Sequence, residues 1–228
     1  YLKLCYTISR HNTLFFIQFY NLELNTKIVN IIISEEIKMK KKAFYFDMTS
    51  CIGCKTCQIA CKDKNNLDVG TLFRKVVSFE TGVFPDAKVY HYSTSCNHCS
   101  NPKCVSGCPT GAMHIDGDLT VQHDASKCVG CKYCIWNCPY GVPQFSVKTG
   151  TVSKCNMCQD LQEVGENPAC VDACIMRCLT IVDVDDIKQD ENLTQNLPIL
   201  PSSNITHPSL FVKAKPQAFD KNFNKQEY

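Results

Sequence analysis

The chain of 228 residues carries 24 Lys and Arg against 22 Asp and Glu, and 18 of its residues are cysteine. This length allows one large domain or two small ones. The formal net charge of +2, with no basic run beyond residues 38–42, gives no reason to expect a nucleic-acid partner.

Residues 1–38 differ in composition from the rest of the chain and are rich in Ile, Asn, Leu, Tyr and Phe. Their apolar runs, 14–20 and 28–33, are shorter than the roughly 20 residues that a membrane-spanning helix needs. Met39 precedes a lysine run that leads directly to the first cysteines. We therefore expect residues 1–38 to be a non-native upstream extension without ordered structure; a poorly ordered natural extension is the alternative.

Short strands and helices are predicted from residue 43 onward. Residues 58–66 favour a short helix that carries Cys61. Gly82 and Pro85 divide one extended segment into two strands, and Asp116-Gly117-Asp118 is a good hairpin signal. The predicted strands lie at residues 43–47, within 72–95, and at 112–115, 119–122, 144–147 and 179–184.

The composition changes after Asp186 to Asn, Gln, Lys, Pro and Ser, with little hydrophobic periodicity. Such a composition is typical of a segment that cannot bury much apolar surface. We therefore expect residues 187–228 to be an extended tail.

Sixteen of the cysteines form four groups of four. The group that begins at Cys128 reads C-x2-C-x2-C-x3-C-P, the spacing of bacterial iron–sulfur proteins. A tight loop can reach three corners of a [4Fe–4S] cube, so the last cysteine of such a run serves the neighbouring cluster. The groups are one (Cys51, Cys54, Cys57, Cys61), two (Cys96, Cys99, Cys104, Cys108), three (Cys128, Cys131, Cys134, Cys138) and four (Cys155, Cys158, Cys170, Cys174).

Two other uses of cysteine explain the groups less well. Cysteines with only two residues between them in a tight loop cannot all form disulfides without strain. Zinc sites favour two C-x2-C pairs, and a third cysteine followed by a fourth before proline exceeds what zinc needs. A structural zinc protein remains the alternative. Four oxidised clusters with their thiolates would change the net charge to about −6.

The motifs resemble a known family, the iron–sulfur subunits of membrane-associated molybdopterin oxidoreductases. The similarity is greatest to the electron-transfer B chains of anaerobic dimethyl sulfoxide reductases and extends over about residues 43–215. The motifs that carry it are C-I-G-C-K-T-C-Q-I-A-C-K-D, S-C-N-H-C-S-N-P-K-C, C-P-T-G-A-M, C-V-G-C-K-Y-C-I-W-N-C-P-Y-G and K-C-N-M-C.

The resemblance implies an α+β fold of two ferredoxin-like units with short hairpins and helices. Groups one and four, in residues 39–95 and 150–186, would form the first unit. Groups two and three, in residues 96–149, would form the second, and residues 187–228 would be an extended partner-binding tail.

The resemblance also implies four cluster ligand sets, which we call quartets 1 to 4. They are quartet 1 (Cys51, Cys54, Cys57, Cys174), quartet 2 (Cys155, Cys158, Cys170, Cys61), quartet 3 (Cys96, Cys99, Cys104, Cys138) and quartet 4 (Cys128, Cys131, Cys134, Cys108). Some relatives replace a cysteine of group three with Trp and bind a three-iron cluster. This chain keeps all four, so four [4Fe–4S] clusters are expected.

One departure from the family lies near quartet 1. Cys174 is followed by Ile175 where the family usually has proline, and Cys178 stands where a small residue is common. We interpret Cys178 as a buried free thiol, with substitute ligation as the alternative.

Residues other than cysteine also flank the groups. Lysines near a cluster would raise its reduction potential if they were not simply solvated; they are Lys55, Lys62, Lys103, Lys127, Lys132 and Lys154. Three aromatic residues of group three would exclude water from a cluster or pack in a small core; they are Tyr133, Trp136 and Tyr140.

The sequence shows no nucleotide-binding glycine loop and no nucleophile–base pair, so one-electron transfer is expected instead of substrate chemistry. The resemblance implies a molybdopterin catalytic subunit at the quartet 1 end and a quinol-oxidising membrane anchor at the quartet 4 end. The chain would be peripheral at a bacterial inner membrane, cytoplasmic or exported folded with a partner. The alternatives are a soluble polyferredoxin, or the same subunit of a polysulfide, nitrite or formate enzyme.

Overall fold

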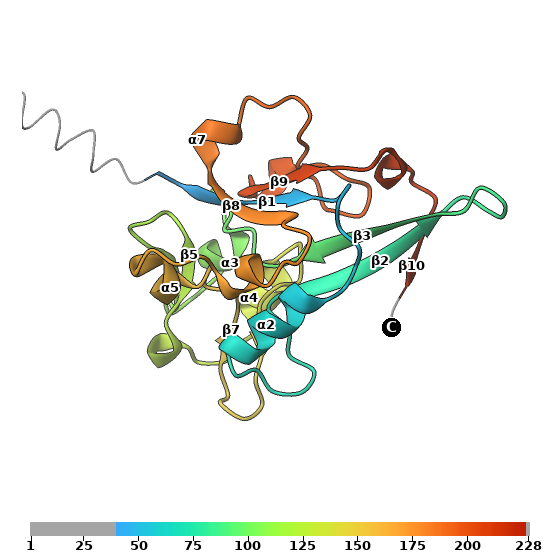
Figure 1. Ribbon diagram of the computed structural model, residues 1–228. Helices are drawn as coiled ribbons and strands as arrows, with labels where there is room; N and C mark the ends of the chain where they lie inside the picture. Colours follow the sequence, from blue (N-terminus) through green and yellow to red (C-terminus); the bar gives the residue numbers. More distant parts are fainter. Residues whose placement is uncertain (1–39, 227–228) are drawn as a thin grey trace, which may run out of the picture. The chain divides into compact units, whose positions relative to one another are not determined.

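The structure, a computed structural model, describes residues 40–226. The expectation for residues 1–38 therefore lies outside the described residues. The first sheet has the order β8-β1-β9, with β1 (Lys42–Asp47) in the middle. Strand β8 (Leu179–Asp183) pairs antiparallel with β1, and β9 (Leu210–Lys213) pairs parallel with it, as Figure 1 shows.

The apolar residues of β1 explain its central place in this sheet. Phe44 and Phe46, two residues apart on the strand, are both buried. Phe44 lies opposite Ile181 on one neighbour and Leu210 on the other. Because β1 is paired on both edges and buries two phenylalanines, it gives the group-one cysteines, which follow it in the chain, a fixed starting point.

The second sheet has the order β10-β2-β3. Strands β2 (Lys75–Thr81) and β3 (Lys88–Thr94) form a long antiparallel hairpin, which projects from the rest of the chain in Figure 1. Strand β10 (Phe223–Gln226) adds to the open edge of β2. The ring of Phe79 on β2 stacks on Tyr90 of β3, with ring centroids 5.3 Å apart.

The remaining elements are short and surround the cysteine groups. Two small hairpins pair β4 with β5 and β6 with β7. These elements are α2 (Thr56–Lys64), α3 (Lys103–Ser106), β4 (Met113–Ile115), β5 (Val121–His123), η1 (Ala125–Lys127), α4 (Tyr133–Asn137), β6 (Gln144–Phe145), β7 (Val152–Ser153), α5 (Gln159–Glu163), α6 (Ala169–Asp172), α7 (Val184–Ile187), η2 (Ser203–Ile205) and η3 (Pro216–Phe219). The mixture of helices and strands agrees with the predicted class, and each predicted strand and the helix near 58–66 is present within a few residues.

The segment after Asp186 differs from its predicted form. It contains strands β9 and β10, one in each of the two three-stranded sheets. Leu210 and Val212 of β9 are completely or nearly completely buried. These apolar runs are too short to stand out in the sequence of an otherwise polar segment. The chain uses them as sheet edges, where pairing with an existing strand supplies their backbone hydrogen bonds.

Cysteine side chains make up much of the interior. A larger core packs beneath the two sheets and includes six cysteines of groups one, two and four together with Cys178. A smaller core contains only Cys104, Met113, Val121, Cys134 and Val152. Within residues 40–226, no helix is long and apolar enough to cross a membrane.

Candidate iron–sulfur sites

Groups one and three share one backbone form. Gly53 and Lys55 have positive φ angles of 70° and 63°, and their counterparts Gly130 and Lys132 have 67° and 65°. The lysine of each pair immediately precedes a helix, α2 or α4, that carries the third cysteine of its group. The turn must be glycine at position 53, because a Cβ there would lie 2.6 Å from the His91 ring.

Groups two and four share a second form. His98 in C-N-H-C and Met157 in C-N-M-C both have positive φ angles, of 40° and 61°. In each group a proline then precedes a short helix, α3 or α6, and this helix carries the third cysteine, Cys104 or Cys170. The four groups are therefore two alternating copies of two loop types, as expected of an internal repeat.

The four cysteines of quartet 1 line one small cavity. Its four cysteines come from the group-one loop, helix α2 and the segment after α6, so residues more than a hundred positions apart meet here. Apolar side chains of Phe46, Val76 and Leu179 close the inner wall. The backbone N–H of Gly53 faces the sulfur of Cys51 and lowers the pKa of that thiol.

The four cysteines of quartet 4 line a second small cavity. Cys108 reaches it from group two and joins the three cysteines of the group-three loop and helix α4. Burial raises the pKa of Cys108, but hydrogen bonds from the backbone N–H of Met113 and from Thr110 more than offset this, so the net shift is downward. Donors aimed at a sulfur in this way favour the thiolate, which is the form that binds iron.

Members of quartets 2 and 3 lie within electrostatic reach of one another. Burial, followed by the charges of Cys96 and Cys138, raises the pKa of Cys104 to about 12. Burial and the charge of Cys170 likewise raise the pKa of Cys61 to about 12, with Cys158 adding to the effect. Such sets of buried thiolates need positive charge among them, and a cubane core of 2+ supplies it.

The quartets follow one another through the protein. Cys57 of quartet 1 lies within electrostatic reach of Cys170 in quartet 2. Cys155 of quartet 2 lies within reach of Cys96 in quartet 3. Cys104 of quartet 3 shares the smaller core with Cys134 of quartet 4. Cysteines of neighbouring quartets thus lie near one another, which is the arrangement that the predicted order 1-2-3-4 requires.

Cys178 is a fifth thiol in the quartet 1 cavity. Its sulfur lies 3.4 Å from that of Cys174, and its carbonyl accepts a hydrogen bond from the backbone N–H of Asp47. A hydrogen bond from its thiol is the main reason that the pKa of Cys51 falls to about 6. Cys178 is therefore buried, as expected, but it is a member of the site and not a distant packing residue.

Arg74 is the residue that sequence reasoning missed. Its side chain is 1% exposed and lies between quartets 1 and 2. Nε and Nη2 have no oxygen or nitrogen partner among the described residues, and the sulfur of Cys170 is the remaining hydrogen-bond partner of the guanidinium. Nothing in the sequence L-F-R-K-V marks this arginine as buried, because the next residue, Lys75, is also a cation and is exposed.

The other side chains noted in the sequence have different outcomes. Among the six lysines only Lys154 is buried, and it donates to the carbonyl oxygens of Val121 and Cys155. Trp136 is 77% exposed, so it does not shield a cluster from water within this chain. Tyr140 is half-buried, and its hydroxyl lies 3.2 Å from that of Thr206.

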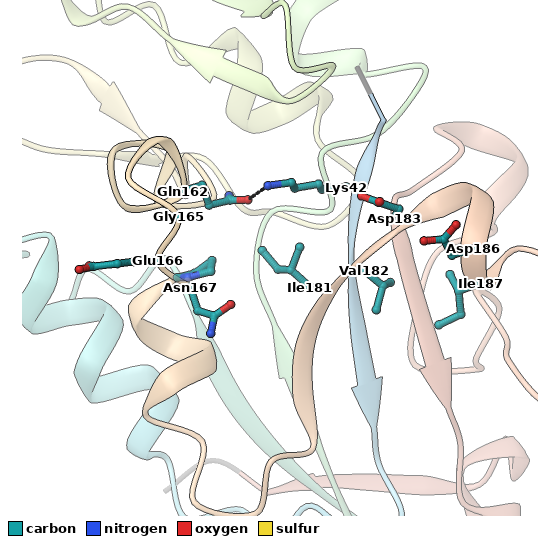
Figure 2. A pocket seen from close by; sticks show the side chains of 11 residues that line it. Lys42, Gln162, Gly165, Glu166, Asn167, Ile181, Val182, Asp183, Asp186 and Ile187 are labelled. Atoms are coloured by element: carbon teal, nitrogen blue, oxygen red, sulfur yellow. Dashed lines mark hydrogen bonds between the residues drawn. The ribbon is translucent and has the colours of Figure 1, made fainter. Parts of the chain in front are cut away.

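A wide surface hollow lies away from these cysteines, beside β8 and the loop after α5. Figure 2 shows it, with Lys42 donating to Gln162 over 2.7 Å. Its lining includes Glu166, Asp183 and Asp186 but no cysteine. The hollow therefore takes no part in the sulfur sites.

The donor set fits iron–sulfur clusters on two observations. Each thiolate of a cubane binds its own iron, so the four sulfurs stand farther apart than the ligands of a single ion. Within residues 40–226 no three Cys, His, Asp or Glu side chains converge on one ion position, while the two end quartets line cavities. The buried side chain of Arg74, whose charged neighbours are cysteines, is the second observation, since a buried cation requires negative charge beside it.

Comparison with known proteins agrees with this geometry. Residues 87–184 match the family described as the 4Fe-4S dicluster domain. The chain is 38% identical over 184 residues to the B chain of anaerobic dimethyl sulfoxide reductase from Haemophilus influenzae, covering 77% of this chain and 90% of the relative. It is 35% identical over 178 residues to the B chain of the same enzyme from Escherichia coli, covering 75% and 87%. It is 36% identical over 170 residues to the B subunit of sulfite dehydrogenase from Allochromatium vinosum, covering 65% and 71%. The chain is thus a [4Fe–4S] protein and belongs to the family of electron-transfer iron–sulfur subunits that includes the B chains of anaerobic dimethyl sulfoxide reductase.

Proposed function

We propose that the chain carries four [4Fe–4S] clusters and passes electrons between a quinol-oxidising membrane anchor and a molybdopterin catalytic subunit. The observation that carries this proposal is the series of four cysteine quartets. A soluble carrier of one or two electrons has no need of four sites in a row. Two separate cavities, each lined by four cysteines that the assignment groups together, suit a chain held between two partners.

The proposed ligands are the quartets themselves, sixteen cysteines in all. The exchange of fourth ligands supports this assignment: Cys174 lines the cavity of the group-one loop, and Cys108 lines that of the group-three loop. Cys61 and Cys138 have the same crossed relation, by their influence on the thiols of groups four and two. When bound, each cluster supplies a site that gains and loses one electron.

Exposed apolar side chains beside the two end cavities support the two proposed partners. Ile52 and Met176 line the quartet 1 cavity and are exposed on its outer side, with Ile175 next to them. Val129 lines the quartet 4 cavity, and Tyr133 and Trp136 are exposed on the adjoining helix α4. Apolar groups gathered at such points are typical of protein interfaces.

The proposed arrangement places the catalytic subunit against quartet 1 and the membrane anchor against quartet 4. The chain would then be peripheral at a bacterial inner membrane and attached through its partners. Relatives include the B subunit of a sulfite dehydrogenase and the iron–sulfur subunit of an arsenate respiratory reductase, so the catalytic partner need not reduce a sulfoxide. We propose a dimethyl sulfoxide reductase-like partner because those B chains are matched over most of their length.

Metal analysis tests the proposed function directly. Protein made and purified without oxygen is expected to contain about sixteen iron and sixteen acid-labile sulfide per chain, four of each per cubane. Zinc near four per chain without sulfide would overturn the proposal and leave a structural zinc protein. About eight iron would reduce the series to two clusters.

The position of Cys178 leads to a prediction about quartet 1. Because its sulfur lies 3.4 Å from that of Cys174, Cys178 can take over the same iron with a small movement. Cys174→Ala alone is expected to keep about sixteen iron per chain, whereas the double change with Cys178→Ala loses about four. Iron and sulfide counts on anaerobic protein measure both variants.

A matched variant in quartet 2 provides the control. Apart from Cys178, every described cysteine is already assigned to a quartet, so Cys170→Ala is expected to lose its cluster by itself. If Cys174→Ala lost iron as completely as the double variant, Cys178 would be only a hydrogen-bond donor to Cys51.

A further inference from the structure

Arg74 is a completely buried cation without a carboxylate partner in the described part of the chain. Its side chain is 1% exposed, and it forms none of the ion pairs between described residues. Burying an unpaired guanidinium is strongly unfavourable, so such a residue persists only where negative charge lies close to it.

The guanidinium is fixed from one side. Nη1 donates to Ser93 Oγ over 3.0 Å and to the Ser93 carbonyl oxygen over 3.4 Å. The face of the group rests on the Phe44 ring, with 4.5 Å between Cζ and the ring centroid. These contacts come from β3, which pairs with β2 along its whole length, and from β1, the central strand of its sheet, so they hold the guanidinium in place.

The free side of the guanidinium faces sulfur. Nε and Nη2 are buried without an oxygen or nitrogen partner among the described residues, and the guanidinium forms a side-chain hydrogen bond to the sulfur of Cys170 in quartet 2. Burial lowers the pKa of Arg74, but the charges of Cys170 and Cys155 in quartet 2 and of Cys57 in quartet 1 together raise it. Ser93 completes a second link, because its hydroxyl also lies 3.6 Å from the sulfur of Cys57.

We propose that Arg74 is a shared counter-ion of clusters 1 and 2, which raises the reduction potentials of both and lowers their mutual repulsion when both are reduced. This inference rests on the proposed function. It adds a role for one residue that the ligand assignment does not contain.

The physical reason is the change in charge on reduction. A cubane with four thiolates changes from 2− to 3− when it takes one electron, so a fixed cation beside it favours the reduced form. The effect is large in a buried site, where solvent screens little. Because Arg74 lies between two quartets, the same charge acts on both, and the pair can hold two electrons more easily than two clusters without it.

Two variants remove the charge of Arg74, and one neighbour serves as control. Arg74→Met and Arg74→Gln both abolish the cation, and Gln keeps hydrogen-bond donors. Lys75→Met removes a cation at the next position of the chain, where the side chain is exposed. Reduction potentials of the four clusters are measured by redox titration of the complete complex, followed by electron paramagnetic resonance.

Both Arg74 variants are expected to make clusters 1 and 2 harder to reduce by at least tenfold in equilibrium constant, which is about 59 mV for one electron. Clusters 3 and 4 are expected to keep their potentials in the same samples, and Lys75→Met is expected to change none. Ser93→Ala, which removes the link to Cys57, is expected to affect cluster 1 more than cluster 2.

Iron and sulfide counts separate failure of this inference from failure of the proposed function. A wild-type chain without four clusters would end both. Four clusters with unchanged potentials in the Arg74 variants would overturn the shared counter-ion alone. Loss of clusters from both variants, whether 1 and 2 alone or all four, would reduce Arg74 to a structural residue.

Discussion

Removal of iron is expected to unfold the part of the chain from residue 40 onward. The larger core includes seven cysteines, and the smaller core has only three apolar residues that are not cysteine. Helices of four to nine residues are too short to be stable by themselves in water. Without the clusters, the remaining apolar contacts must hold two three-stranded sheets in which most strand pairs join segments that are far apart in the chain.

The magnitude of this effect follows from general scales. A domain is stable by about 5–15 kcal/mol. Binding of a single structural zinc to a small peptide supplies about 10–16 kcal/mol. Losing four clusters therefore removes more free energy than the fold has in reserve, and the protein without iron should show no cooperative transition.

Circular dichroism during heating measures this prediction. The holoprotein is divided into two samples, one treated with a chelator without oxygen and one left untreated as the control. A loss of the cooperative melting transition together with the brown colour is expected. A chelated protein that still melts cooperatively near the temperature of the control would show that the apolar core suffices.

The second large effect is expected from Cys138→Ala. This cysteine belongs to group three in sequence but acts on the thiols of group two, since its charge is among the causes that raise the pKa of Cys99 and Cys104. We therefore expect the variant to lose cluster 3 and to keep cluster 4, whose cavity Cys138 does not line. Iron should fall from about sixteen to about twelve per chain.

Loss of cluster 3 would divide the series in its middle. Electrons from quinol should then stop at cluster 4, while a soluble reductant such as dithionite still reduces clusters 1 and 2. Quinol oxidation coupled to the catalytic subunit is expected to fall to background in membranes that carry the complete complex. The readouts are this activity and the resonance signals of each cluster.

Cys108→Ala is the matched variant for this experiment. Cys138 belongs to group three but is assigned to the cluster of group two, and Cys108 has the converse relation. It lies in group two but lines the quartet 4 cavity, so it should remove cluster 4 and leave cluster 3. If each substitution removed the cluster of its own sequence group instead, the crossed assignment would be wrong.

Local features of the fold could be predicted because they depend on neighbouring residues. The turn at Asp116-Gly117-Asp118 does join β4 and β5, and Gly53 adopts the positive φ that its place between two cysteines requires. Cysteine spacing likewise reflects how far a loop can reach around one cluster. Such signals are contained within fewer than a dozen residues.

Features that depend on distant partners could not be predicted. Leu210–Lys213 is a short run in a polar segment, and only the exposed edge of β1 makes it a strand. The burial of Arg74 is decided by Phe44, Ser93 and sulfur atoms from separate segments. The exposure of Trp136 is also a property of the surface around it, which composition does not reveal.

The first sheet has a consequence for synthesis of the chain on the ribosome. Both neighbours of β1 come from the last quarter of the sequence, and the parallel one, β9, begins only at Leu210. At about 5–20 residues per second, roughly ten to thirty seconds separate the emergence of β1 from that of β9. Throughout this time the group-one cysteines have emerged while their sheet is still open. The cellular machinery that delivers iron and sulfide thus has a period in which Cys57 and Cys61, both buried in the complete fold, are still accessible.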